Sequence, residues 1–558
     1  MWDALVRPIR EHLPLWLMVL PLLGVVFVGV AKRAGAETVR RAMQVHLLLS
    51  IALSIWLVAA YEPLKPVTSS EQAALFGPFQ RFQFRDSFAW VGESRSALLE
   101  QFNRRGERRV LEVPVQWGPD ICFAVGVDGI SIWFVALSVL LVAVGVSGER
   151  ITPHSPLSWL WLQASLVGTF VALDVVLFVA CWMSTLLAIA WLVGRGGNSQ
   201  RHDAVLRLLK ASWLGGWLVT LGLGGLVLAF QWVLPSPDSA EAPLVFAIPE
   251  LVAGIGRVTV GGGSTHLWGT INVWLFWLLV VGFTWPLGLA PLHHAFVDAF
   301  ASAPRGVALV LAGVLLKVGV YGWLRFVVPV FPELLSQHAD TFTTLVGLSS
   351  LLAAALAFGE RDWHRRIALA TCSSVGLSLI GVMTLTLEGL TGGVLRVLSH
   401  GLTAGLLVWL LPREELTQAR RVSEGSSPAN TRWRVVLVRF SLVAWIGLPG
   451  LSGFVAEFVT PFGLFQHAFN AAALSLMTSG LIAWMWVRAD RERLDWLQTG
   501  WARSDAFVAA TLVGLNIALG VAPQFVVNRL QPSWMSSLPI DRGSSASLSP
   551  TQSVSEVR

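Results

Sequence analysis

The sequence predicts an all-α membrane protein with about fourteen transmembrane helices. The chain has 558 residues, of which 54% are hydrophobic and only 13% charged. Its mean hydropathy is +0.64, which lies outside the range of soluble globular proteins. Apolar stretches of about 20 residues, enough to cross roughly 30 Å of hydrocarbon, recur along the chain. Strands of a transmembrane barrel would be shorter and would alternate with polar residues, so a barrel is not expected.

The apolar segments that predict these helices cover most of the chain. They span residues 13–30, 43–60, 125–147, 156–173, 175–194, 206–231, 270–292, 304–328, 341–359, 366–387, 392–411, 435–466, 470–488 and 504–527. Arg7 and Arg10 precede the first segment, as in a signal peptide. That segment is long for a signal peptide and further spans follow it, so a retained first helix is favoured.

Three stretches are expected outside the membrane: residues 61–124, the Pro- and Gly-containing residues 232–269, and the Ser-rich tail 531–558. The tail is poor in apolar residues, which predicts disorder. The Arg-rich residues 413–439 are expected to form a solvated loop against lipid headgroups. Asp174 lies between the segments 156–173 and 175–194 and is expected to be solvated at the membrane interface.

The placement of basic residues predicts the orientation. Lys and Arg gather in or beside the loops that follow the odd-numbered segments, which places those loops in the cytoplasm and both termini outside. The basic region 81–109 falls on the other side, but long loops count little in this rule. The isoelectric point of about 9.8 therefore reflects membrane topology, and a nucleic-acid partner is not expected.

No cofactor or metal site is expected in this chain. The three cysteines, Cys122, Cys181 and Cys372, are far apart and lack metal-ligand spacing. No phosphate-binding loop is present, and the glycine clusters lack the strand–turn–helix context of a dinucleotide site.

Two predicted helices contain helix-disrupting residues. The seventh reads FTWPLGLAPLHH, with Pro286 and Pro291, and the twelfth reads WIGLPGLSGFVAEF, with Pro449 and Gly450. Breaks at membrane depth free backbone groups that need polar partners, and a matching pair of broken helices is typical of inverted-repeat transporters. Helices 4–8 and 9–13 would be two five-helix repeats. Simple proline kinks are the alternative interpretation.

Three titratable groups lie inside apolar segments. Lys317 is one of only four lysines among 40 basic residues, and a lysine at the centre of a membrane helix costs about 3 kcal/mol. From that position the interface is about 15 Å away, beyond the reach of one side chain. Glu457 follows the break in the twelfth helix, and His400 lies in the eleventh. Such groups can take up and release protons, although a lone membrane histidine commonly only bonds a neighbouring helix.

Several motifs carry a resemblance to a known family. They are GVDGISIWFVALSVLLV at 126–142, PLHHAFVDAFASAP at 291–304, LAGVLLKVGVYGWLRF at 311–326, LRVLSHGL at 395–402 and LPGLSGFVAEF at 448–458. Together they resemble the antiporter-like proton-pumping subunits of respiratory complex I, the subunit M or mitochondrial subunit 4 family, of which this chain looks like a divergent member. Mrp-type antiporters and membrane subunits of inorganic-carbon uptake complexes share this fold and parts of the motifs.

The resemblance implies a proton path through each subunit, with site residues that can be matched to this sequence. Lys317, His400 and Glu457 match the lysine, histidine and glutamate of helices 8, 11 and 12. His293 matches a histidine at the end of broken helix 7 and ranks second.

Three family positions are occupied differently. Met183 stands at the helix 5 glutamate, Pro286 at the helix 7 lysine and Ser374 at the helix 10 histidine. The charged pair of the first half of the fold is therefore absent, whereas the central lysine, Lys317, and the second-half groups His400 and Glu457 remain.

The resemblance implies a non-redox subunit of a complex I type NADH:quinone oxidoreductase in the bacterial inner membrane. Residues 1–124 would hold two helices and an external loop, and residues 125–530 the antiporter-like translocation domain. Its partners would be the bilayer and the other membrane and peripheral subunits, which would carry out the electron transfer. The alternatives are a paralogue that has lost transport, and a subunit of a cation/proton antiporter or an inorganic-carbon uptake complex.

Overall fold

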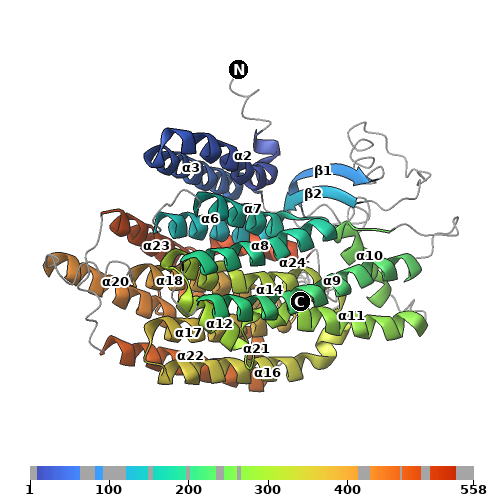
Figure 1. Cartoon of the computed structure of the whole chain (residues 1–558). Coiled ribbons are helices and arrows are strands. Elements are labelled where there is room, and N and C mark those ends of the chain that lie inside the picture. Colours follow the sequence, from blue (N-terminus) through green and yellow to red (C-terminus); the bar gives the residue numbers. More distant parts are fainter. Residues whose placement is uncertain are drawn as a thin grey trace, which may run out of the picture.

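The computed structural model describes residues 9–62, 82–91, 121–148, 155–196, 201–233, 244–260, 266–411, 428–465, 468–491 and 503–535. Within these ranges the chain forms a bundle of helices that run alongside one another, with a two-stranded sheet beside it (Figure 1).

The helices carry the labels of Figure 1. In chain order they are α2 (Leu13–Ala34), α3 (Ala36–Ala60), α6 (Ser131–Ser147), α7 (Ser155–Val171), α8 (Val175–Gly196), α9 (Arg201–Val233), α10 (Ile248–Val260), α11 (His266–Thr284), η1 (Trp285–Leu287), α12 (His293–Ser302), α13 (Arg305–Val310), η2 (Leu311–Leu315), α14 (Leu316–Gly322), η3 (Trp323–Val327), α15 (Val328–Val330), α16 (Pro332–Gly359), α17 (Trp363–Met383), α18 (Leu387–Leu410), α20 (Pro428–Ile446), α21 (Ser452–Phe465), α22 (Phe469–Asp490), α23 (Arg503–Val521) and α24 (Gln524–Met535).

Each apolar segment predicted from the sequence overlaps at least one of these helices. Ten helical segments in the described part of the chain are long and apolar enough to cross a membrane, and the pair α23 and α24, bent by 64°, would be an eleventh. The chain is thus a multi-pass integral membrane protein, and the count of fourteen spans stays a prediction.

One element, a two-stranded sheet, was not predicted from the sequence. Strand β1 (Gln83–Val91) pairs antiparallel with strand β2 (Ile121–Val127). The helix predicted from residue 125 begins only at Ser131, because residues 125–127 belong to β2 and the N-cap residue is Ile130. The Asp128 carboxylate accepts the backbone N–H groups of Ile130 and Ser131 at 3.2 and 2.8 Å.

The stretches predicted outside the membrane also contain structure. Helix α10 lies within residues 232–269, and α20 begins at Pro428, inside the predicted Arg-rich loop. Helix α24 extends to Met535, so the first residues of the predicted tail are helical, and residues 536–558 lie outside the described part. Residues 412–427 of the Arg-rich segment lie outside it too.

Asp174 was expected to be solvated, but it is buried. Its side chain is 1% exposed and accepts the backbone N–H groups of Val176 and Leu177, the first turn of α8, at 2.8 and 3.2 Å. A carboxylate at a helix N-terminus satisfies donors that have no partner within the helix. The residue is therefore a buried cap.

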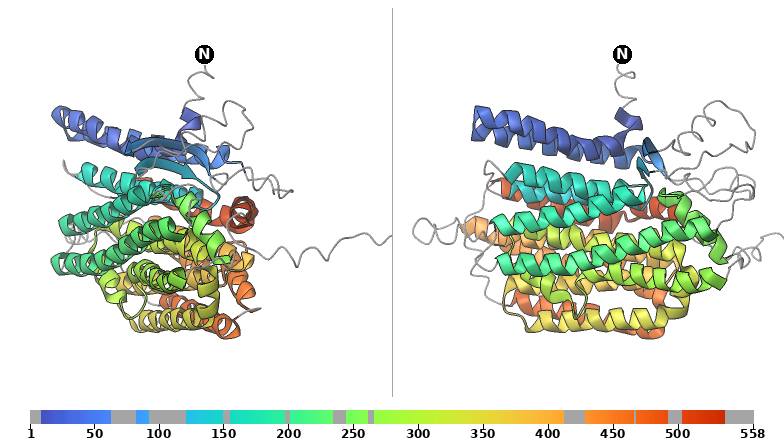
Figure 2. Two further views of the ribbon diagram at one scale, coloured as in Figure 1. Left: turned by 90° about the vertical axis from the view of Figure 1, so that its right-hand side faces the viewer. Right: turned by 45° about the vertical axis from the view of Figure 1, so that its right-hand side comes forward.

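The bundle has two edges and a buried middle. Helices α2 and α3 form one edge and α16 and α22 the opposite one, with α14, α17 and α18 between them (Figures 1 and 2). The apolar windows of α17, of α18 and of the segment Arg305–Val330 are entirely buried, whereas those of α2 and α3 are 39% and 33% buried. Lys317 and His400 therefore lie on the most enclosed helices.

Both interruptions expected from the sequence are present as breaks between helices. Between α11 and α12 the chain turns through η1 and Gly288, whose φ is +67°. Between α20 and α21 it turns through Gly447 and Gly450, with φ of +84° and +87°. A side chain at such φ values is strained, so glycine suits these turns. A Cβ on Gly447 would also lie 2.9 Å from Cγ of Glu457, so this turn packs directly against that glutamate.

Candidate functional site

Lys317 lies in a distorted helix at the centre of the molecule. The segment Arg305–Val330 contains two π-helical turns, η2 and η3, on either side of α14, which carries the lysine. Such turns often mark functional positions, because they redirect backbone carbonyls. Lys317 is 1% exposed, and its Nζ donates to the carbonyl of Ala312 in η2 and bonds Nδ1 of His400 at 3.0 Å.

Small residues bring the lysine and histidine helices together. A Cβ on Gly401 of α18 would lie 3.1 Å from the carbonyl oxygen of Gly313 in η2. Gly401 follows His400, and Gly313 follows Ala312, whose carbonyl binds Lys317. Close backbone approach through glycine is a common packing device between membrane helices. It places Lys317 within hydrogen-bonding distance of His400.

His400 is held between α14 and α20. Its ring packs edge-on against Trp445, with ring centroids 4.8 Å apart and an interplanar angle of 86°. The Trp445 indole N–H donates to Ser374 Oγ at 3.2 Å. The histidine is 6% exposed, and its Nε2 is buried without a hydrogen-bond partner in the described part of the chain. A buried ring nitrogen of this kind needs a polar neighbour, and water is the simplest one.

Glu457 follows the break before α21 and is bound by two donors. Arg396 of α18 forms a bidentate pair with it, Nη1 to Oε1 at 2.5 Å and Nη2 to Oε2 at 2.8 Å. Ser479 of α22 donates to Oε2 at 2.6 Å. The side chains of Glu457 and Arg396 are 23% and 4% exposed. The glutamate is therefore anchored by a cation on the helix that also carries His400.

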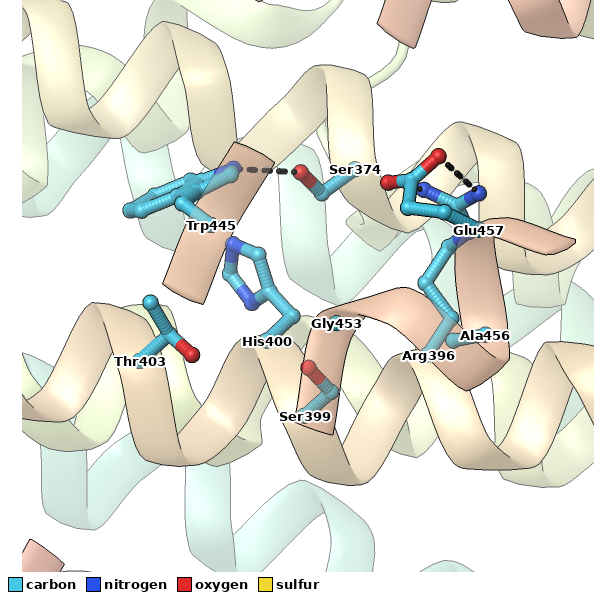
Figure 3. Close-up of a pocket in the computed structure, with 9 residues that line it drawn as sticks. All are labelled: Ser374, Arg396, Ser399, His400, Thr403, Trp445, Gly453, Ala456 and Glu457. Carbon is cyan, nitrogen blue, oxygen red and sulfur yellow. Dashed lines mark hydrogen bonds and ion pairs between the residues drawn. The ribbon is translucent and has the colours of Figure 1, made fainter. Parts of the chain in front are cut away.

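A small cavity joins His400 to Glu457 (Figure 3). Its volume is about 20 Å³, enough for one water molecule. The lining residues are Ser374, Arg396, Ser399, His400, Thr403, Trp445, Gly453, Ala456 and Glu457. Three of the four residues predicted for the site are thus gathered: Lys317 touches His400, and His400 shares a cavity with Glu457. We call these three the second-half cluster, because His400 and Glu457 lie in the second predicted repeat and Lys317 lies on the last helix of the first.

A neutral network closes the cavity on the side of α23. Ser399 bonds Ser452 at 2.9 Å, and Ser452 and Thr403 both donate to Oδ1 of Asn516, at 2.6 and 2.9 Å. Ser399 and Thr403 also line the cavity, so this network borders it directly. It fixes Ser452, the first residue of α21, against α18 and α23.

His293 does not join the cluster. It begins α12, is 5% exposed, and its ring lies 4.0 Å from that of His294. Its Nδ1 has no hydrogen-bond partner in the described ranges. Asp298, one turn further on, binds Arg207 and Arg365 at 3.1 and 2.5 Å, which ties α12 to α9 and α17.

The positions of the missing charged pair meet on α9. A Cβ on Gly216 would lie 2.4 Å from Sδ of Met183, and one on Gly215 would lie 3.1 Å from Cδ of Pro286. Two adjacent glycines thus contact both residues. We call Met183, Gly215, Gly216 and Pro286 the first-half patch. None of its side chains can carry a charge.

The sequence interpretation missed three residues of the site. Arg396 was visible as an arginine within an apolar segment, four positions before His400, but it received no role. Ser479 and Asn516 carry no such signal, because isolated Ser and Asn residues are common in membrane helices. Ser374, recognised only as a replacement, accepts the Trp445 hydrogen bond and lines the cavity.

Broken helices around buried titratable groups define a class of membrane protein. In a multi-pass bundle these features mark ion and proton pathways. A family model described as "NADH:quinone oxidoreductase/Mrp antiporter, TM" matches residues 172–483, and the chain belongs to this family. It is a distant homologue of NADH-quinone oxidoreductase subunit M. The subunit M of Rhodobacter capsulatus is 29% identical over 439 residues, which cover 75% of this chain and 82% of the relative.

Solved structures show the same fold. A chain of respiratory complex I from Thermus thermophilus with bound NADH superposes with a TM-score of 0.71 at 22% identity, over 93% of this chain and 98% of that one. A chain of the Mrp complex from Dietzia sp. gives 0.69 at 16% identity, over 95% and 97%. The chain therefore has the antiporter-like fold of complex I subunits, and both similar chains belong to multisubunit membrane complexes.

Proposed function

We propose that this chain is the subunit M of a complex I type NADH:quinone oxidoreductase and translocates protons while partner subunits transfer electrons. The observation that carries the proposal is the second-half cluster, in which a buried lysine bonds a histidine that shares a water-sized cavity with a half-buried glutamate. The subunit M relatives support the choice of assembly.

The proposed transfer has three steps. A protonated lysine only donates, so Nδ1 of His400 is then the acceptor and Nε2 carries the ring proton. Lys317 passes a proton to Nδ1, Nε2 releases its proton to a water in the cavity, and that water passes one to Glu457. Each group acts as an acid and a base in turn. Neutral Lys317 is then reloaded from the opposite side.

The finer architecture belongs to the same proposal. Helices 4–8 and 9–13 of the predicted order would form two inverted five-helix repeats within fourteen spans, and the breaks after α11 and α20 would be the equivalent broken helices. We place the chain in the bacterial inner membrane with both termini outside. Residues 125–530 would be the translocation domain, and the chain would bind no cofactor of its own.

The test uses the intact assembly purified from native membranes. Lys317→Met or Glu457→Gln should lower the number of protons translocated per electron while electron transfer continues. An unchanged ratio in either variant would remove the proposal. Thr371→Val is the control, because its buried α17 hydroxyl donates to the main-chain carbonyl of Ile367.

The first-half patch favours a second candidate, a structural paralogue without transport. Met183 and Pro286 replace the charged pair with groups that cannot titrate. The same substitutions of Lys317 and Glu457 would then change assembly or stability but not the ratio of protons to electrons.

The likeness to an Mrp chain favours a third candidate, a subunit of a cation/proton antiporter. Co-purification distinguishes the assemblies. Flavin and iron-sulfur subunits would support complex I, and their absence with sodium-dependent proton exchange would support an antiporter. A soluble zinc partner would instead indicate inorganic-carbon uptake.

A further inference from the structure

Arg396 is a fourth charged group beside the second-half cluster. It lies on α18 four residues before His400, so both side chains are on the same face of the helix and both line the cavity. Its side chain is 4% exposed, and its two terminal nitrogens bind the two oxygens of Glu457. Figure 3 shows this pair at one end of the cavity, with His400 and Trp445 at the other.

The pair fixes the charge of Glu457. A guanidinium stays protonated under all conditions relevant to proteins, whereas a carboxylate buried without a partner is costly. With both oxygens bound at 2.5 and 2.8 Å, Glu457 is stabilised in its ionised form. An ionised carboxylate is the form that can accept a proton from the cavity.

The hydrogen bonds also distinguish the two oxygens of Glu457. Oε2 accepts from Arg396 and from Ser479, which occupies both of its lone pairs. Oε1 accepts from Arg396 alone in the described part of the chain and keeps one lone pair. Oε1 is therefore the atom available to a proton.

Among the side chains at and around the cavity that are named here, Arg396 is the cation whose charge does not change. Lys317 from α14, His400 from α18 and Glu457 from α21 are the groups that can change charge. Helices α17, α20, α22 and α23 contribute neutral groups: Ser374, Trp445, Ser479 and Asn516. A protonated His400 would lie one helical turn from Arg396. Repulsion between these two positive charges would weaken the ion pair between Arg396 and Glu457.

We propose that Arg396 is the positioning residue of the proton transfer, because it keeps Glu457 ionised and directs Oε1 towards the cavity water. The inference rests on the proposed function. In the transfer, an O–H bond of the water breaks, a new O–H bond forms on Oε1, and the water regains a proton from Nε2 of His400. Arg396 then loses the carboxylate charge that it bound. The pair supplies in the second half of the fold the carboxylate and cation that are absent from the first-half patch.

The protonation state of Glu457 can be measured without any proton transport. The full chain in lipid vesicles at pH 7 is studied by infrared spectroscopy, and a carboxylic acid C=O band is assigned to Glu457 where it is present with Glu457 and absent when Glu457→Gln is added to the same variant. The wild type should show no such band. Arg396→Gln should show one, and Arg396→Gln/Glu457→Gln should lose it. Arg396→Lys, which keeps the charge, should again lack the band.

Proton flux gives the second readout. Under an imposed membrane potential, Arg396→Gln should lower proton flux into the vesicles at least about tenfold, and Arg396→Lys should recover part of it. Arg366→Gln is the matched control, because Arg366 is equally buried at 4% exposure but binds the main-chain carbonyl of Glu360. It should change neither readout.

Two results would overturn the role of Arg396: an ionised Glu457 in Arg396→Gln, or a protonated Glu457 with wild-type flux. If Arg396→Gln does not fold, a carboxylic acid band in Arg396→Lys contradicts the proposal equally. Failure of the proposed function looks different. Glu457→Gln would then leave the flux unchanged, whatever the infrared result for Arg396.

Discussion

Two regions of the helical bundle have opposite chemistry. The second-half cluster, on α14, α18 and α21, combines a lysine, a histidine and a glutamate around a water-sized cavity. The first-half patch, on α8, α9 and η1, has methionine, two glycines and proline where the family resemblance led us to expect a charged pair. Both regions are next to a broken or distorted helix. The breaks therefore do not by themselves create a polar pathway. The side chains beside a break determine whether polar groups line it.

The largest expected difference between the regions is in proton flux. Lys317→Met should lower the flux into vesicles about 100-fold, because it removes an acid–base group from the path. Met183→Leu, a volume-conserving change in the first-half patch, should leave the flux within about twofold. Equal losses in both variants, measured with a pH-sensitive dye under an imposed potential, would contradict the division between the halves.

A charge placed in the first-half patch should be costly. Met183→Glu should lower the free energy of unfolding by about 2.5 kcal/mol, because the patch has no partner for a carboxylate. Adding Pro286→Lys should return part of that loss, because the two positions contact adjacent glycines of α9. Thermal unfolding in detergent measures both. A stable Met183→Glu single variant would show that the patch is hydrated.

The two glycines of the patch should differ in their tolerance of a side chain. A Cβ on Gly215 would lie 2.9 Å from the carbonyl oxygen of Gly282, a backbone atom that cannot move aside. A Cβ on Gly216 meets the flexible end of Met183. Gly215→Ala should thus cost about 1.5 kcal/mol of stability and Gly216→Ala much less, as measured by thermal unfolding. Equal costs would mean that Met183 is as rigid as the backbone.

The smallest expected effect is that of Asp362→Ala, which should change stability but not proton transport. Asp362 caps α17, where its carboxylate accepts the backbone N–H groups of His364 and Arg365 at 2.7 and 3.2 Å. Asp362→Ala should lower stability by about 1 kcal/mol without changing proton flux. A loss of flux in this variant would show that transport follows stability, and the relay variants would then need reinterpretation.

The same cap has a predictable pH dependence. Hydrogen bonding with His364 lowers the pKa of Asp362 from 3.8 to about 2. Since the folded pKa is the lower one, the stabilisation is present above the ordinary value of 3.8 and is lost as the pH falls towards 2. Asp362→Asn keeps a capping side chain but should remove this loss from an acid unfolding series.

The helices could be predicted from sequence because hydropathy and length determine which segments cross a bilayer. The hairpin β1–β2 could not, because its strands are separated by about thirty residues and pair through the backbone. Asp174 was misplaced for a related reason. Whether a carboxylate at a helix start is solvated depends on the neighbouring segments. Here Asp174 forms a β-bridge with Ala247, and the adjacent Leu173 donates to Ala124 of β2.

The site could be predicted only in part. Lys317, His400 and Glu457 stand out as titratable residues in apolar segments, and the resemblance links them. Their contacts depend on helix packing that sequence spacing does not encode, such as the approach of Gly401 to Gly313. Arg396 could not be recognised from sequence spacing, because its partner is a glutamate 61 positions away.

The central claim is that protons cross this chain through the second-half cluster and not through the first-half patch. The most direct test is the number of protons translocated per electron in the intact assembly, compared between Glu457→Gln and Met183→Leu. We predict a lower ratio in Glu457→Gln and a wild-type ratio in Met183→Leu. A wild-type ratio in Glu457→Gln would contradict the account.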